Sequence, residues 1–164
     1  HVILSIKMIL SNAGMLIEYS GNTFRELKRV KVNQNLCDEL GHMNIQYYYS
    51  ALSDGMFRVM ELIGIPKEDI PTRGTSFALH KEEAYFLHEL RAGDEFYVAT
   101  ALAHIGTKSI VFENRFFSVP DNHLLFKAKF ISVFMDLRAR ISISIPVGVR
   151  DALLREIPEY MDND

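Results

Sequence analysis

The sequence lacks several features that would fix its chemistry at once. It contains one cysteine, Cys37, which excludes an internal disulfide framework and a thiolate zinc cluster. The six histidines show no zinc-ligand spacing, so we expect no metal site. No apolar stretch reaches the length of about 18 residues that a membrane helix requires. The net charge is −3 without a long basic run, which argues against nucleic acid as a partner. These absences favour a cytoplasmic protein without a membrane or nucleic-acid partner.

The first residues also lack the order of a secretory signal. The apolar run from His1 to Leu10 holds its one cation, Lys7, inside the run, whereas a signal places charge before it. Met8 and Met15 could each be a natural start. We therefore treat residues 1–22 as an N-terminal extension, part of which need not be native. Residues 23–164 are expected to form a single domain.

One long helix is predicted between residues 44 and 64. Apolar residues recur there at steps of three and four, which marks one face of a helix about five turns long. Asn44 is suited to cap the first turn, and Gly64 with Pro66 supplies the stop signals. Gly55 inside the helix indicates close packing against a sheet.

Most of the remaining chain alternates with the period of strands. Residues 23–32 form the first predicted strand, and four more follow the helix at 76–87, 96–105, 109–119 and 123–135. Their short connections predict an antiparallel meander. A short helix is expected at residues 147–157. The fold class is therefore α+β, with a five-stranded antiparallel sheet packed on one long central helix.

The chemically informative stretch is NLCDELGHMNIQYYYS, residues 35–50. Gly41 permits a sharp turn between Asp38 and the helix start, and the first helical amides lack internal partners. These amides and the helix dipole suit developing negative charge. A thioester carbonyl docked there would face the amide of Ile45, with Asp38 on its other side. Near a helix N-terminus the carboxylate should stay ionised, as a nucleophile or general base must.

The pattern Asp-x-x-Gly-His-x-Asn followed by Tyr resembles the 4-hydroxybenzoyl-CoA thioesterase-like hotdog family. Here it is formed by Asp38, Gly41, His42, Asn44 and Tyr48. The likeness continues through residues 93–94 and 106–117 and covers residues 23–157. It implies the hotdog fold, hydrolysis of an acyl-CoA to a free acid and CoA, and no metal or organic cofactor. It also implies a homodimer, or a dimer of dimers, with active sites at the interface.

The resemblance assigns roles to particular positions. Asp38 matches the catalytic aspartate, the Ile45 amide the oxyanion donor, and Tyr48 a wall of the acyl pocket. His42 joins the catalytic set, while Gly41 and Asn44 shape the substrate site. The turn Thr107, Lys108 and Ser109 would lie near CoA phosphate. Many members carry an aspartate at the position of Leu36, and its absence leaves the acyl class open. The Gly-His-Met spelling also resembles betainyl-CoA thioesterases, whose trimethylammonium head one of the three tyrosines at 47–49 could bind.

Several alternatives compete with these roles. Asp38 could only brace its loop, His42 could pack the loop without moving protons, and Asn44 is first of all an N-cap. Cys37 lacks a basic neighbour in sequence and reads as a small packing residue. Glu82 and Glu83 lie on a strand from which other hotdog enzymes draw a catalytic glutamate, although a solvated strand edge is the simpler explanation. The chain could also be a non-catalytic acyl-CoA-binding module, or a hotdog hydratase or dehydratase.

Overall fold

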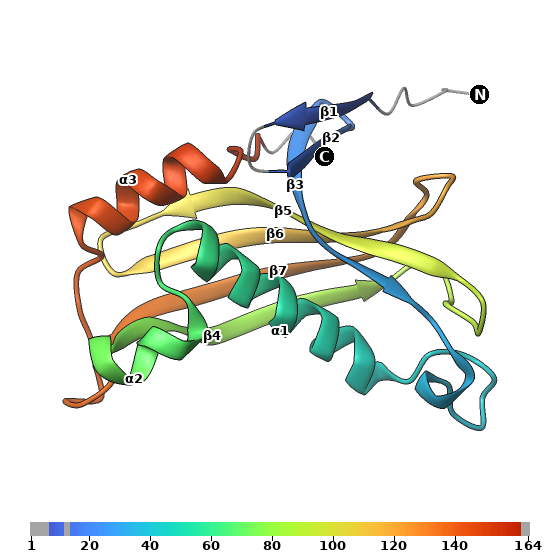
Figure 1. Cartoon of the computed structure of the whole chain (residues 1–164), viewed down its shortest axis with the longest axis horizontal. Helices are drawn as coiled ribbons and strands as arrows, with labels where there is room; N and C mark the ends of the chain where they lie inside the picture. The colour runs from blue at the N-terminus through green and yellow to red at the C-terminus, as the bar shows by residue number, and fades with distance from the viewer. Residues whose placement is uncertain (1–6, 12–13, 162–164) are drawn as a thin grey trace.

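The computed structural model describes residues 7–11 and 14–161, and its elements are labelled in Figure 1. The three α-helices are α1 (Ile45–Leu62), α2 (Ile70–Arg73) and α3 (Val147–Glu156). The strands are β1 (Lys7–Ser11), β2 (Gly14–Tyr19), β3 (Asn22–Lys31), β4 (Thr75–Phe86), β5 (Glu95–Ile105), β6 (Ser109–Ser118), β7 (Leu124–Asp136) and β8 (Ile141–Ser142). Among these described residues, no helix combines the length and apolar character needed to cross a membrane.

All strands belong to one antiparallel sheet, which curves around α1 (Figure 1). The strand order is β1-β2-β3-β5-β6-β7-β4, and β8 pairs with the end of β7. Because β4 follows α1 in the chain but pairs with β7, it becomes the edge of the sheet farthest from β1. The helix lies against the concave face of the sheet. The side of α1 that faces β4 is therefore the side nearest this edge of the sheet.

The predicted helices and strands are confirmed, but the predicted number of strands is wrong. The predicted meander holds for β5, β6 and β7 only, because β4 pairs with β7 and not with β5. Each of the five predicted strands matches an observed one to within one residue, and α1 occupies the predicted helix. The sheet has eight strands because β1 and β2 come from the predicted extension and β8 follows β7. Part of the extension, residues 1–6 and 12–13, lies outside the described residues. The domain limits at residues 22 and 23 stay a prediction, although the sheet runs across them.

Strand β2 joins the sheet for two physical reasons. Ser20 and Gly21 both have positive φ (50° and 76°) and connect β2 to β3 by a tight turn whose twist suits a hairpin. Ile17 of β2 is fully buried in a small cluster with Phe24 and Tyr97. That cluster is separate from the main core, which contains the buried side chains of α1. The N-terminal hairpin is thus anchored by burial as well as by backbone pairing.

The helix approaches the sheet closely at Gly55. A Cβ atom at this position would lie 3.2 Å from Cγ1 of Val98 and 3.3 Å from Cδ1 of Leu27. Tyr48, Leu52 and Val59 lie on the same buried face of the helix. The glycine therefore lets the backbone of α1 rest directly on β3 and β5, as its position in the sequence predicts.

The edge strand β4 exposes several large apolar side chains. Leu79, Tyr85 and Phe86 expose 51%, 52% and 49% of their surfaces. The charged residues between them, at positions 81–83, are exposed as well. A long edge that presents both unpaired backbone and apolar side chains is suited to pairing with another strand.

Replacing Gly55 by valine should destabilise the fold by about 1–3 kcal/mol, because the added side chain overpacks the contact with Val98 and Leu27. Chemical unfolding of the two proteins measures the difference. The matched control is Ser50→Val, an exposed position of the same helix, which should change stability by no more than about 0.5 kcal/mol. Equal effects of the two substitutions would contradict the close approach.

Candidate active site

The loop before α1 is closed by its own backbone. The amide of Asn44 donates to the carbonyl of Leu36 at 2.9 Å, and that of Asp38 donates to His42 at 3.1 Å. The Gly41 amide donates back to the Asp38 carbonyl at 3.0 Å, and Gly41 itself has a φ of 79°. Residues 36–44 therefore form a small hairpin with Asp38 at the start of its turn. Gly41 is required there because a positive φ strains other residues.

Both carboxylate oxygens of Asp38 accept hydrogen bonds. The side-chain amide of Asn44 donates to Oδ2 at 2.8 Å, and the backbone amide of Leu40 donates to Oδ1 at 3.0 Å. These two donors, the Asn44 amide foremost, hold the pKa of Asp38 below its ordinary value, and the nearby His42 lowers it further. The carboxylate is therefore charged at neutral pH, as the sequence predicts.

Asn44 connects this carboxylate to the helix. Its Oδ1 accepts from the amide of Gln46 at 3.0 Å, which confirms it as the N-cap of α1. Its Nδ2 is the donor to Asp38. One side chain thus caps the helix and orients the carboxylate. Among the residues that the structure describes, no acceptor contacts the amide of Ile45, the first residue of α1.

Asp38 and the helix start open onto one depression of about 410 Å³. The predicted residues Asp38, His42, Asn44, Ile45 and Tyr48 all line it, whereas Gly41 supports the loop behind them. The other walls are formed by Leu40, Met43, Phe86, Leu87, His88 and Glu89. The structure therefore brings together the predicted carboxylate, helix start and tyrosine.

Tyr48 contributes a packed wall, since it is only 3% exposed. The centroid of its ring lies 4.9 Å from the ring centroid of Phe86, 5.2 Å from that of Phe126 and 5.8 Å from that of Phe116. Burial also raises the pKa of its hydroxyl, so it stays neutral at ordinary pH. An aromatic cluster of this kind fixes the floor of the depression beside the carboxylate.

The wall at residues 86–89 was missed by sequence reasoning. It follows directly after β4, which ends at Phe86 beside Tyr48. The adjacent apolar residues Phe86 and Leu87 break the alternation of the strand, and this break is the one signal that could have identified the wall. Glu89 is paired with Arg91 at 2.8 Å, so its charge is partly neutralised at the rim.

The two glutamates of β4 lie outside the depression. Glu82 accepts a hydrogen bond from the hydroxyl of Tyr49 at 3.0 Å, and Glu83 lies 3.4 Å from Lys81. Cys37 is half-buried beside the carbonyl of Asn33, with its sulfur 3.8 Å from that oxygen. Neither glutamate contacts Asp38 among the described contacts.

The turn Thr107–Ser109 lies at the opposite end of the sheet from Asp38. Its Lys108 carbonyl accepts from the amide of Phe134, whereas the depression lies near Phe126, eight residues earlier in β7. Eight residues of strand span roughly 26 Å. Figure 1 shows this separation: β5 and β6 meet at the end where α3 lies, while the loop before α1 is at the other end. Within one chain, the turn and the carboxylate are not brought together.

Comparison with known families gives an independent view of this arrangement. Residues 32–156 match the family described as the thioesterase-like superfamily. The acyl-acyl carrier protein thioesterase ATL3, chloroplastic, of Arabidopsis thaliana is 28% identical over 127 residues, which are 77% of this chain. The match covers 66% of that relative's length.

Solved structures share the fold at low sequence identity. A Staphylococcus aureus protein in complex with CoA has a TM-score of 0.74 and 17% identity, with 84% of this chain and 89% of that chain covered. A 1,4-dihydroxy-2-naphthoyl-CoA thioesterase from Synechocystis has a TM-score of 0.68 and 14% identity, with 77% and 93% covered. At these identities the likeness concerns the fold alone.

The contact between Asn44 and Asp38 predicts a measurable titration. Replacing Asn44 by serine keeps a capping residue but removes the amide donor, so the pKa of Asp38 should rise toward the ordinary aspartate value of about 3.9. Carbon-13 NMR of the side-chain carboxyl against pH measures it. Because the folded pKa is the lower one, the stabilisation by Asp38 is present above its unfolded pKa and is lost as pH falls through the folded pKa.

The control for this titration is Glu39→Gln at an exposed neighbouring position, which should leave Asp38 unchanged. An Asp38 carboxyl that titrates at its ordinary value in the unsubstituted protein would contradict the geometry.

Proposed function

Because the chain belongs to the thioesterase-like superfamily, we propose that it hydrolyses a thioester to a carboxylic acid and a thiol, with Asp38 as the reacting carboxylate. One observation carries the proposal: the side chain of Asn44 holds Asp38 beside the first turn of α1, and both face one depression. A charged acceptor and a set of outward-facing amides are the two groups that acyl transfer needs.

The proposed reaction places the thioester carbonyl against the start of α1. Its oxygen gains negative charge when the carbon is attacked, and the amide of Ile45 donates to that oxygen. Asp38 either attacks the carbon itself, giving an acyl anhydride that water then hydrolyses, or removes a proton from the attacking water. In both routes the carbon–sulfur bond breaks and the thiolate takes up one proton from water: the proton that Asp38 removed in the general-base route, or the proton released when water hydrolyses the anhydride in the other. Water is the only co-reactant, so neither a metal nor an organic cofactor is required.

An acyl-CoA is the substrate that we propose. The fold is shared with a protein solved in complex with CoA and with a thioesterase that acts on a CoA ester. A second candidate is an acyl group carried by acyl carrier protein, because the Arabidopsis relative is named for that substrate. Both substrates present a thioester, so the same carboxylate would serve either. The acyl group and its carrier are separate questions for experiment.

A second copy of the chain is expected to complete the site. The exposed edge of β4 can pair with the same edge of another copy, as isologous dimers do. Antiparallel pairing about a two-fold axis would place the Thr107–Ser109 end of one copy beside the Asp38 end of the other. Lys108 could then meet CoA phosphate at the depression of its neighbour. A homodimer, or a dimer of such dimers, is therefore part of the proposal.

Asp38→Asn should lower turnover by about 10²–10⁴-fold, because the amide can neither attack nor accept the proton. Thiol release from a panel of acyl-CoA and acyl-carrier-protein thioesters measures the effect and identifies the carrier. Glu39→Gln, which alters an exposed carboxylate next to it, should keep full activity. Unchanged turnover in both Asp38→Asn and Asp38→Ala would exclude Asp38 from the reaction. Thioesters that bind without being cleaved would favour a binding module.

The proposed pairing predicts the mass in solution. Light scattering should give at least twice the chain mass of 18.8 kDa, because the apolar edge of β4 is exposed in a single copy. Replacing exposed Tyr85 of this edge by aspartate should weaken the dimer, while Asp54→Ser on the exposed face of α1 should leave the mass unchanged. A monomer at micromolar concentration would refute the shared site.

A further inference from the structure

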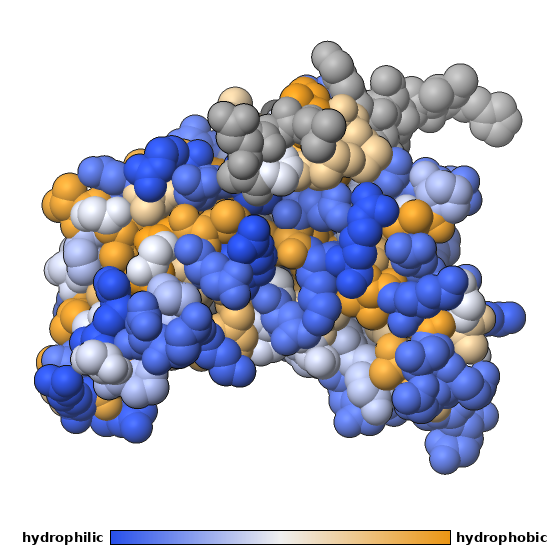
Figure 2. Space-filling view, in the orientation of Figure 1, coloured by the Kyte–Doolittle hydropathy of each residue, from blue (hydrophilic) through white to orange (hydrophobic). Residues whose placement is uncertain are grey.

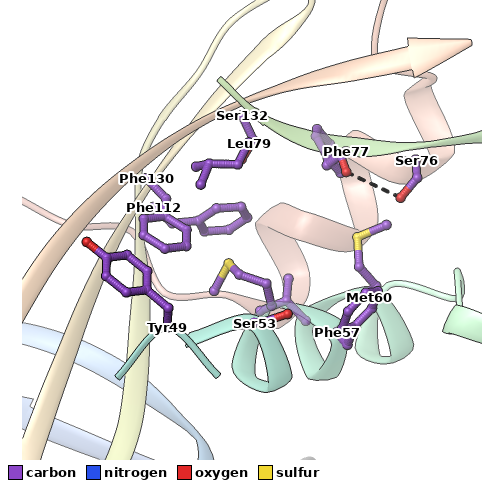
Figure 3. A pocket seen from close by; sticks show the side chains of 12 residues that line it. Tyr49, Ser53, Phe57, Met60, Ser76, Phe77, Leu79, Phe112, Phe130 and Ser132 are labelled. Atoms are coloured by element: carbon purple, nitrogen blue, oxygen red, sulfur yellow. Dashed lines mark hydrogen bonds between the residues drawn. The ribbon is translucent and has the colours of Figure 1, made fainter. Parts of the chain in front are cut away.

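A second, apolar pocket lies between the middle of α1 and the strands β4, β6 and β7. Its volume is about 220 Å³. Figure 3 shows Phe112 and Phe130 of the sheet near Tyr49 at one end of the pocket, and Met60 of the helix near Phe77 of β4 toward the other end. Methionine side chains adapt their shape to what they contact, so this pocket suits a flexible hydrocarbon. The depression at Asp38 shares none of these side chains.

The pocket exists because small residues occupy inward positions of the sheet. Ser132 of β7 is 7% exposed and stands between the inward-facing residues Phe130 and Phe134. Ser76 of β4 is also 7% exposed and lines the same space. An aliphatic side chain at either position would fill part of the volume. The cavity is therefore encoded at two inward positions of the sequence.

The pocket and the depression lie on one seam between α1 and β4. Along α1, Tyr48 borders the depression, whereas Tyr49, Met56 and Met60 border the pocket. Along β4 the order is reversed, since Phe86 lies at the depression and Leu79 at the pocket. The helix and strand thus run in opposite directions with the two cavities in succession. Tyr49 is four residues from Ile45, so the pocket begins roughly 6 Å along the helix from the proposed oxyanion site.

A hydrogen bond crosses the seam between the two cavities. The hydroxyl of Tyr49 donates to Oε1 of Glu82 at 3.0 Å. In Figure 3 the Tyr49 ring closes one end of the pocket, and Met60 lies toward the other end. In a single copy of the chain Glu82 is exposed, so water can compete for this hydrogen bond. Figure 2 shows a hollow at the lower edge of the molecule, between the part that carries α2 and the part that carries the loop before α1.

We propose that this pocket receives the distal part of a straight, apolar acyl chain whose thioester is at Asp38, and that the Tyr49–Glu82 hydrogen bond gates its entry. The proposal rests on the proposed function. Short acyl groups end before the gate, whereas longer ones displace the Tyr49 ring and bury their ends against Phe112, Phe130 and Met60. The pocket and the gate then determine which chain lengths are hydrolysed fastest.

The pocket is tested with Ser132→Leu, which fills it, and Ser132→Ala as the matched control. We measure kcat/KM for a series of straight-chain acyl thioesters on the carrier that the unsubstituted protein prefers. A methylene kept out of the pocket costs about fourfold, so exclusion of two or three should lower kcat/KM for the longest chains by roughly 15–60-fold. The shortest chains should be unaffected, and Ser132→Ala should keep the original profile. Ser53→Phe, from the exposed side of α1, is a second way to fill the pocket if Ser132→Leu folds poorly.

The gate is tested separately with Tyr49→Phe, which keeps the ring but removes the donor, and with Glu82→Gln, which keeps an acceptor. Tyr49→Phe should favour longer chains by several-fold in kcat/KM, and Glu82→Gln should change the profile less. An identical profile in Tyr49→Phe would refute the gate.

Two outcomes would overturn the pocket itself. One is an equal effect of Ser132→Leu on every chain length. The other is a Ser132→Leu protein whose chain-length profile is unchanged but whose mass in solution differs from that of the unsubstituted protein. That result would mean that a second copy of the chain, and not an acyl chain, fills the pocket. If the unsubstituted protein cleaves no thioester, the proposed function fails, and calorimetry with non-hydrolysable thioether analogues still tests whether affinity grows with chain length and whether Ser132→Leu abolishes that growth.

Discussion

The candidate site depends on the two hydrogen bonds made by the side chain of Asn44. Its oxygen accepts from Gln46 at the helix start and its nitrogen donates to Asp38, so the positions of the carboxylate and of the first helical turn are fixed relative to each other. A loop aspartate without this contact would sample many orientations. The free energy needed to order it would then add to the activation free energy of the proposed reaction. The backbone bonds between residues 36 and 44 give the same loop its shape. The depression, the low pKa of Asp38 and the open amide of Ile45 all depend on this geometry.

The geometry of the candidate site was predictable because it is local in the sequence. The cap at Asn44, the turn at Gly41 and the position of Asp38 follow from residue preferences within ten positions. The helix and five strands were likewise predictable, since each carries its own periodicity. Gly55 indicated close packing, and the structure has Val98 and Leu27 next to it.

The remaining features depend on long-range pairing, which periodicity does not encode. The N-terminal strands were missed because their apolar residues could equally belong to a leader or an unpaired segment; only the pairing of β2 with β3 and the burial of Ile17 decide the matter. The wall at Phe86 requires knowing that β4 runs antiparallel to α1. The apolar pocket requires knowing that Ser76 and Ser132, more than fifty positions apart, both face α1. Its volume arises because neither of these two inward positions carries a large side chain. A sequence motif does not report such a feature.

The self-contained hairpin at residues 36–44 also has an evolutionary consequence. The carboxylate proposed to react and the groups that orient it are encoded in one short stretch, whereas the surfaces that would select the acyl group are spread over α1, β4, β6 and β7. Substitutions in the second set can reshape the cavity without moving the carboxylate. Such a division lets proteins descended from one ancestor diverge in the acyl group that they accept while they keep the same reaction. It agrees with a fold that is shared at sequence identities as low as 14%.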